Sequence, residues 1–406
     1  MIIRFELPNG IRVIHKQTAS PVVFCGLTVE AGTRDEEANE HGIAHFLEHT
    51  LFKGTKKRRA YHINNRLDSA GGELNAFTTK EETVIQACVT ADDFPKAIEL
   101  IADITFNSVF PKNEINKEKQ VVCEEIDSYD DCPSELIFDD FEDLLFSGSS
   151  IGRNILGTKK SVKSYTPEDV KRFVLRTYNT DRMVFSSTGK ISERRLKYYC
   201  EKYFGTILSN PRQFSRIEPN EYKIFDTKKR KKTHQAHVIL GNRGYNRYDD
   251  RRTALTLLLN YLGGPASNSM LNMLLREKHG LVYTVETNCT MYDDTGNVTI
   301  YYASSETNME KTHDRIRSEL AKAGKTPLSK YQLAKAKKQL VGQYLIAQEN
   351  NEHLMQTMGK NILNYNCYEG HETVVRQIEA VTATDLADIA NEIFMPDMIS
   401  RLAYIT

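Results

Sequence analysis

The chain has 406 residues, enough for two or three domains of ordinary size. Its 54 lysines and arginines balance its 54 aspartates and glutamates, and this zero net charge argues against a surface built for nucleic acid. Hydrophobic residues make up 40% of the chain and charged residues 27%, as in soluble globular proteins, and the apolar stretches are shorter than the roughly 18 residues that a membrane helix needs. We therefore expect neither nucleic acid nor membrane as a partner.

The first residues and the cysteines indicate the compartment. Arg4 and Glu6 carry charge where a secretory signal would be apolar. The seven cysteines are scattered and form no C-x-x-C pair, which favours reduced thiols packed as small hydrophobic groups. Both features predict a cytoplasmic protein.

Periodicity and turn residues predict the elements in chain order. Alternating apolar residues and the turn at 8–10 predict strands within residues 1–33. The patterns that follow predict a helix over 39–52, a strand over 84–89, helices over 93–106 and 111–129, a strand over 236–240 and a helix over 252–262.

The order strand, loop, helix occurs twice, which suggests an internal repeat. Gly32 and Gly54 are as far apart as Gly241 and Gly263, and this register defines an offset between the two halves. At that offset, the residues opposite His45, Glu48 and His49 are Ala254, Leu257 and Leu258. Only the first copy would then keep a polar helix face.

The fold class predicted is α+β, with two structurally similar domains, each an antiparallel-rich sheet with helices packed on one face. Prolines and a basic run interrupt the pattern around residues 211–232. We therefore expect an N-terminal domain over 1–210, a linker over 211–232 and a C-terminal domain over 233–406.

The helix predicted over 39–52 contains the pattern H-x-x-E-H at residues 45–49. On a helix, His45 and His49 project side by side about one turn apart, with Glu48 on the same face. Two imidazoles at this spacing suit zinc, and a carboxylate beside them can act as a general base on water. This order is the inverted form of the zincin motif. The alternative is a pair of packed or surface histidines on an amphipathic helix.

A catalytic zinc site needs a third ligand, and the long charged helix over 111–129 offers candidates. Glu118 and Glu125 are seven residues apart and share one helix face. Glu124 points about a quarter-turn away and competes with Glu125. Spacing alone does not choose between them.

These residues resemble the inverted-zincin metallopeptidases typified by pitrilysin, insulin-degrading enzyme and the β subunit of mitochondrial processing peptidase. Residues 42–55 are close to the zinc helix of that family. Its third ligand is a Glu about 75 residues beyond the second His, which the resemblance places at Glu125. The resemblance also implies that Glu118 is the supporting acidic residue of the same helix.

Two further segments carry the resemblance. Residues 72–78 look like the family's edge strand, which would bind an extended peptide through Asn75, Ala76 and Phe77. Residues 276–283 look like the segment that completes the active site, in which Arg276 and Tyr283 would hold the substrate and polarise its carbonyl.

The resemblance therefore implies a zinc-dependent endopeptidase with one Zn²⁺ per chain, held by His45, His49 and Glu125. Glu48 would activate the water on the metal, and the substrates would be short unstructured peptides in an enclosed chamber. The chain length matches the two-domain bacterial branch, for which the resemblance implies a homodimer. The alternative is a catalytically silent scaffold or partner subunit of a peptidase complex.

Two other patterns are expected to be structural. Residues 148–152 satisfy G-x-S-x-G, but an acidic helical segment precedes them where a nucleophile elbow requires a strand. The basic runs at 56–59 and 228–232 lack interleaved aromatic residues, so we expect solvated loop and linker charges.

Overall fold

The computed structural model describes residues 1–406, apart from the side chain of Pro396. The chain forms two compact units. The first unit comprises residues 1–127, 153–216 and 346–369, and the second comprises residues 128–152, 217–345 and 370–406. Among the described residues, no helix combines the length and apolar character needed to cross a membrane.

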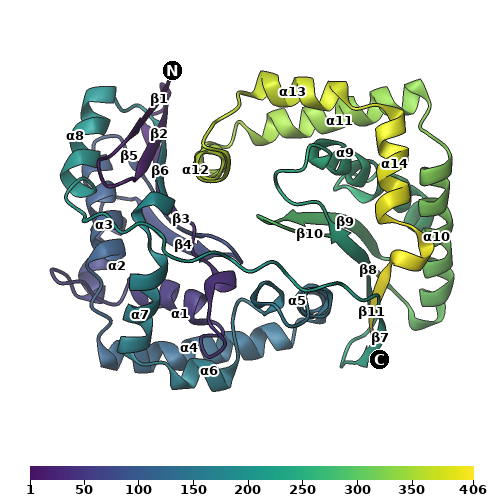
Figure 1. The fold of residues 1–406 in the computed structure, drawn as a ribbon, viewed down its shortest axis with the longest axis horizontal. Helices are drawn as coiled ribbons and strands as arrows, with labels where there is room; N and C mark the ends of the chain where they lie inside the picture. The colour runs from purple at the N-terminus through teal and green to yellow at the C-terminus, as the bar shows by residue number, and fades with distance from the viewer. The chain divides into compact units, whose positions relative to one another are not determined.

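A six-stranded sheet forms the centre of the first unit (Figure 1). Its strands in chain order are β1 (Ile2–Glu6), β2 (Arg12–Gln17), β3 (Val22–Val29), β4 (Glu73–Thr78), β5 (Thr83–Thr90) and β6 (Met183–Gly189). Their order in space is β1-β2-β6-β3-β5-β4, and only β2 and β6 pair in parallel. β4 is therefore an edge strand.

A five-stranded sheet forms the centre of the second unit. Its strands are β7 (Asp226–Arg230), β8 (Ala236–Gly244), β9 (Thr284–Met291), β10 (Gly296–Ser304) and β11 (Ser400–Ile405). They lie in the order β7-β11-β8-β10-β9, with β7 and β11 parallel and the other pairs antiparallel. From β2 onward the first sheet has the same order and the same directions. The two units are therefore copies of one α+β topology.

Fourteen α-helices accompany the sheets in the described chain. They are α1 (Ile43–Leu51), α2 (Ala60–Asp68), α3 (Phe94–Phe106), α4 (Lys112–Asp130), α5 (Pro133–Leu145), α6 (Lys159–Ser164), α7 (Pro167–Thr177), α8 (Glu193–Tyr203), α9 (Arg252–Gly263), α10 (Met309–Lys325), α11 (Lys330–Ala347), α12 (Asn351–Tyr365), α13 (His371–Ala380) and α14 (Ala383–Ile393). Capping boxes begin both α7, at Thr166 with Asp169, and α14, at Thr382 with Asp385. These two helices precede the equivalent strands β6 and β11.

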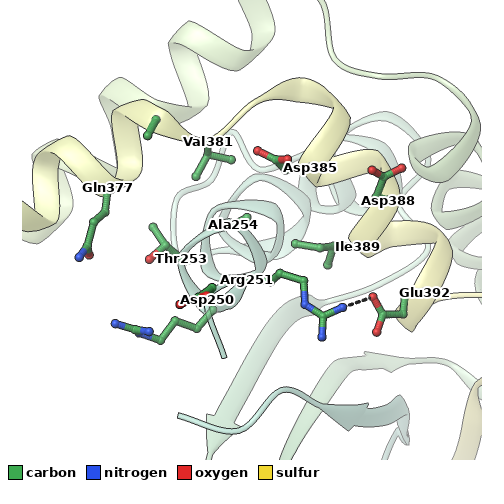
Figure 2. A pocket seen from close by; sticks show the side chains of 12 residues that line it. Asp250, Arg251, Thr253, Ala254, Gln377, Val381, Asp385, Asp388, Ile389 and Glu392 are labelled. Carbon is green, nitrogen blue, oxygen red and sulfur yellow. Dashed lines mark hydrogen bonds and ion pairs between the residues drawn. The ribbon is translucent and has the colours of Figure 1, made fainter. Parts of the chain in front are cut away.

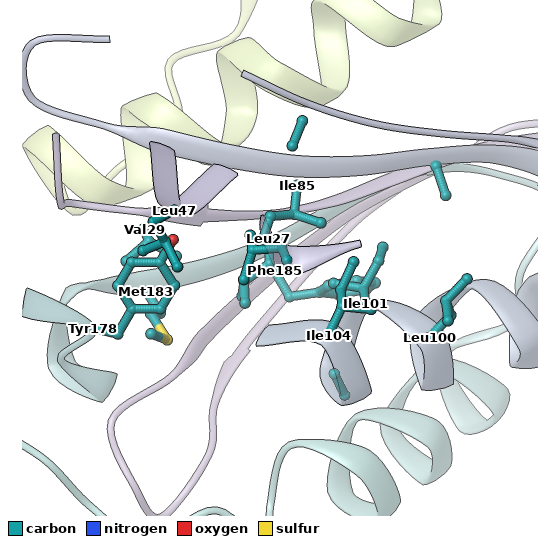
Figure 3. Packing of buried hydrophobic residues seen from close by; sticks show 14 of the residues in the cluster. Leu27, Val29, Leu47, Ile85, Leu100, Ile101, Ile104, Tyr178, Met183 and Phe185 are labelled. Carbon is teal, nitrogen blue, oxygen red and sulfur yellow. The ribbon is translucent and has the colours of Figure 1, made fainter. Parts of the chain in front are cut away.

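The main core of the first unit lies between the sheet and the helices α1 and α3. Leu27 and Phe185 project from β3 and β6 toward Ile101 of α3, and all three side chains are fully buried (Figure 3). Burying side chains of this size stabilises the fold by about 1.5–3 kcal/mol each. Because α1 packs on the same sheet, this core fixes which face of α1 is buried.

Each sheet also has a helix on its second face, and the chain exchanges these helices between its halves. In sequence, α12 comes after β10 of the second sheet, yet it packs on β6 and β3 of the first unit. Its apolar side chains, including Met358, cover Val184 and Ile14. Conversely, α5 packs on β8 and β11 in the second unit, where Phe141 contributes to the core.

This exchange changes two details of the sequence interpretation. The expected boundaries, 1–210 and 233–406, put residues 128–152 and 346–369 with the wrong sheet. Helices were expected on one face of each sheet, whereas both faces are covered. The physical reason is that the strand residues alternate between two apolar faces, and both need cover.

The expected linker also contains structure. Residues 226–230 form β7, which pairs with β11, and Lys228 and Lys229 make ion pairs with Glu310 and Asp140 at 2.9 and 2.6 Å. Residues 228–230 of the basic run therefore belong to a folded edge strand.

The glycine register needs a correction as well. Gly32 lies beyond the end of β3, whereas Gly241 lies inside β8, opposite Thr299. Between β3 and α1 there are 13 residues (30–42), but only 7 (245–251) separate β8 from α9. The helices therefore correspond at the predicted offset, and the loops before them do not.

Candidate metal centre

Gly42 and Glu36 fix the start of α1, the helix that carries the H-x-x-E-H pattern. Gly42 has φ 89°, a left-handed conformation that favours glycine, and Gly157 lies so close that a Cβ on Gly42 would be 2.6 Å from its Cα. The backbone N–H groups of Gly42 and Ala44 donate to the buried Glu36 carboxylate at 2.9 and 3.0 Å. A side chain outside the helix thus binds two of the first free N–H groups of α1.

His45, His49 and Glu125 converge, each offering one ligand atom, and these atoms all lie within 4.8 Å of one another. His45 Nε2 is 3.7 Å from Glu125 Oε1, and His49 Nε2 is 3.4 Å from Glu125 Oε2. The imidazole rings meet edge to face, with centroids 4.8 Å apart. The exposed neighbour Glu124 does not belong to this group.

The group fits a divalent metal such as zinc. Ligands at 2.0–2.1 Å from a tetrahedral zinc are roughly 3.3 Å apart, close to the N–O separations between the two histidines and Glu125. Glu125 Oε2 is buried and has no regular hydrogen-bond donor among the described residues, which suits an oxygen that faces a cation. Two imidazoles and one carboxylate also leave a fourth position open, as catalytic zinc sites do.

Glu118 contacts the His49 ring at Nδ1, the nitrogen that does not face Glu125. Its Oε2 lies 3.3 Å from His49 Nδ1, and its Oε1 is 2.7 Å from the Lys53 ammonium. Glu118 is buried, and the hydrogen bonds from His49 and Lys53 outweigh the effect of burial, so its pKa is lowered. Lys53, in the turn that follows α1, is a further residue of this site, and no sequence pattern pointed to it.

The charges in the group differ from residue to residue. Burial, together with the neighbouring His49, lowers the pKa of His45. Burial acts to lower the pKa of His49 too, but Glu118 and Glu125 outweigh it and raise this pKa to about 9. The pKa of Glu125 is lowered, chiefly by the adjacent His49 ring. Glu125 therefore stays an anion, ready to act as a ligand.

Glu48 lies on the same helix face, beside β4. Burial raises its pKa, while Thr78 at the end of β4 and the charge on His49 act in the opposite direction. A carboxyl group with a raised pKa takes up a proton more readily near neutral pH. Glu48 thus has the environment of a general base.

The expected peptide-binding residues lie on an available edge. Asn75, Ala76 and Phe77 belong to β4, which pairs with β5 on one side and has no strand on the other in the described sheet. Asn75 is exposed, Phe77 is half-buried, and α1 packs against this strand. An extended peptide could therefore add to the sheet next to the metal group.

Arg276 and Tyr283 lie in the second unit. Arg276 is near the end of a π-helical segment, η4 (Asn272–Lys278), and Tyr283 directly precedes β9. The guanidinium carbon is 6.0 Å from the tyrosine ring centroid, and both side chains are largely exposed. The two residues are thus neighbours that a ligand can reach.

The second unit has the helix equivalent to α1 without its ligands. Ala254, Leu257 and Leu258 of α9 are buried in an apolar core. Beside the first turn of α9 lies a cavity of about 550 Å³, shown in Figure 2, where Arg251 pairs with Glu392 at 2.7 Å. This cavity contains no residue of the predicted site.

The G-x-S-x-G segment at 148–152 is a turn that ends in a short 3₁₀ helix. It follows helix α5, which ends at Leu145, so the loop interpretation is confirmed. It does not have the strand-to-helix geometry of a nucleophile elbow.

Comparisons with known proteins agree with this arrangement. A sequence model described as "Insulinase (Peptidase family M16)" matches residues 12–159, and one described as "Peptidase M16 inactive domain" matches residues 164–340. The second description suits a unit whose equivalent helix has no ligands.

Similar proteins extend over nearly the whole chain. The uncharacterized zinc protease YmxG of Bacillus subtilis is 32% identical over 398 residues, covering 98% of this chain and 97% of its own. The uncharacterized zinc protease ML0855 of Mycobacterium leprae is 33% identical, covering 97% and 89%. A crystal structure of a protease from Helicobacter pylori has the same fold, with a TM-score of 0.92 at 21% identity and full coverage of both chains.

Proposed function

Because the chain belongs to the insulinase family of peptidases, family M16, we propose that it is a zinc-dependent endopeptidase acting on short unstructured peptides. The observation that carries the proposal is the convergence of His45, His49 and Glu125 beside Glu48. A peptidase needs such a group complete, and here each member is present in the folded chain.

His45, His49 and Glu125 would hold the zinc, with Glu118 orienting the His49 ring through Nδ1. Zinc, when bound, supplies Lewis acidity that polarises a carbonyl and lowers the pKa of water. Glu48 would take a proton from the attacking water and pass it to the leaving amine. The raised pKa of Glu48 favours both halves of this transfer.

The preference for unstructured peptides is supported by the edge strand β4. Main-chain hydrogen bonds to residues 75–77 would align an extended segment, and a stable folded protein does not offer one. We therefore expect an unfolded protein to be cleaved much faster than the same protein folded.

Arg276 and Tyr283 are proposed to act on the substrate. Their exposure makes them available, and a tyrosine hydroxyl can stabilise negative charge that develops on a carbonyl oxygen. Tyr283→Phe should lower kcat by about 10²–10³-fold with little change in zinc content. Unchanged kcat in this variant would remove Tyr283 from the mechanism.

The central experiment measures chelator-sensitive cleavage of an unstructured fluorogenic peptide by the wild-type chain and by Glu48→Gln. We expect cleavage that needs metal, and a Glu48→Gln protein that retains zinc but does not turn over. Retained activity in Glu48→Gln would contradict the proposed base.

The rival function is a silent scaffold or partner subunit. It predicts far less than one zinc per chain after purification without chelators, whereas the peptidase predicts about one. The homodimer implied by the resemblance stays a prediction, to be tested by the mass of the purified protein in solution.

A further inference from the structure

A second polar cavity lies in the first unit, between α2 and the start of α3. It has a volume of about 470 Å³ and shares no residue with the metal centre. Its lining consists of Lys57, Arg58, His62, Asn65, Arg66, Ser69 and Lys96. This lining contains neither a carboxylate nor an apolar side chain.

One face of α2 supplies most of the lining. His62, Arg66 and Ser69 recur at the spacing of one helix face, while Ile63 and Leu67 on the other face are fully buried. The cavity is thus lined by the polar face of α2, by Lys57 and Arg58 of the preceding basic run and by Lys96 of α3.

The two arginines of the lining, Arg58 and Arg66, are held in place by carboxylates of α3. Arg58 makes two bonds to Glu99, at 2.7 and 2.8 Å, and one to Asp103 at 2.5 Å. Its backbone N–H donates to Thr55 Oγ1, which in turn donates to Asp103. Arg66 reaches the same Glu99 at 3.5 Å, and its Nε has no hydrogen-bond partner among the described residues.

The remaining cations stand at the surface of the cavity. Lys57 is exposed, and Lys96 is exposed and pairs with Asp93. The lining carries four cationic side chains, those of Lys57, Arg58, Arg66 and Lys96, and the carboxylates that pair with lining residues are three, those of Glu99, Asp103 and Asp93. The local charge is therefore positive although the chain as a whole is neutral.

We propose that this cavity binds a compact anion bearing a phosphate group. Fixed arginines, flexible lysines, a histidine and a serine hydroxyl are the donors that phosphate oxygens accept from. The volume is that of a small-molecule site, and because no aromatic side chain lines it, a stacked nucleobase is not the expected ligand.

The test is a titration of the zinc-loaded full chain with inorganic phosphate, followed by ³¹P line broadening at constant ionic strength. We expect saturable binding that sulfate, a tetrahedral anion of similar size, displaces. The double variant Lys57→Ala/Lys96→Ala should weaken binding at least about tenfold, because it removes two charge-assisted donors.

The matched control is Lys335→Ala/Lys338→Ala, which removes two exposed lysines from α11 in the second unit. It should stay within about twofold of wild type. Binding that does not saturate, or that responds equally to both double variants, would overturn the proposal. Phosphate bound at the zinc instead would survive the Lys57/Lys96 variant, and that result would also overturn it.

Discussion

The two nitrogens of the His49 ring face two different carboxylates: Nδ1 lies 3.3 Å from Glu118, and Nε2 lies 3.4 Å from Glu125. Both glutamates come from α4, two helical turns apart. The ring is therefore held between them, and the nitrogen that would bind metal is selected by the hydrogen bond on its opposite side.

Removing the supporting carboxylate should weaken metal binding without abolishing it. In Glu118→Gln we expect zinc affinity to fall by about 10–100-fold, because His49 loses its charged partner. Competition with a zinc-sensitive dye measures this. Glu114→Gln, on the same helix but paired with Lys117, is the control and should bind zinc like wild type.

The choice of third ligand can be tested directly. Glu125→Gln should purify with far less zinc than wild type, whereas Glu124→Gln, whose side chain is outside the cluster, should keep it. Metal content by mass spectrometry decides between them. The reverse pattern would assign the ligand to Glu124.

Stability should depend on pH through Glu36. Burial raises the pKa of this carboxyl from 4.5 to about 8, although Ala44 and Gly42 donate to it. Between these values the folded state keeps a proton that the unfolded state has lost, so the contribution of Glu36 to the free energy of unfolding falls as pH rises from about 4.5 to 8.

The Glu36→Gln variant isolates this effect because it cannot titrate. Urea unfolding at pH 5, 6.5 and 8 should show the variant gaining stability relative to wild type as pH rises. If the difference between the two proteins is the same at every pH, Glu36 does not titrate in this range.

The exchanged helix α12 should be essential to the first unit. Met358 is fully buried against Val184 and Ile14, so Met358→Ala should lower the free energy of unfolding by about 2–5 kcal/mol. Met273→Ala, at a half-exposed position, is the control and should change it by less than about 0.5 kcal/mol. Equal effects in chemical denaturation would contradict a packing role for α12.

The sequence predicted local features well, since local spacing determines them. The 3.6-residue helical period alone puts His45, Glu48 and His49 on one face, and α1 forms where that pattern predicts a helix. The strands and helices near residues 84–130 and 236–262 also form where periodicity indicated them. Among the local features, the glycine register was wrong, because a loop can gain six residues without disturbing the helix after it.

By itself, the sequence placed His45, Glu48 and His49 on one helix face and predicted the repeat of one α+β unit. Spacing did not choose between Glu124 and Glu125 as the third ligand, because a contact between α1 and α4 depends on how both helices pack on a shared core. Only the tertiary structure brought Glu125 to the histidines, added Lys53 behind Glu118 and gathered the basic cavity beside α2. It also decided that α5 and α12 cover sheets far from them in sequence, since an apolar face accepts any complementary helix that the chain can bring to it.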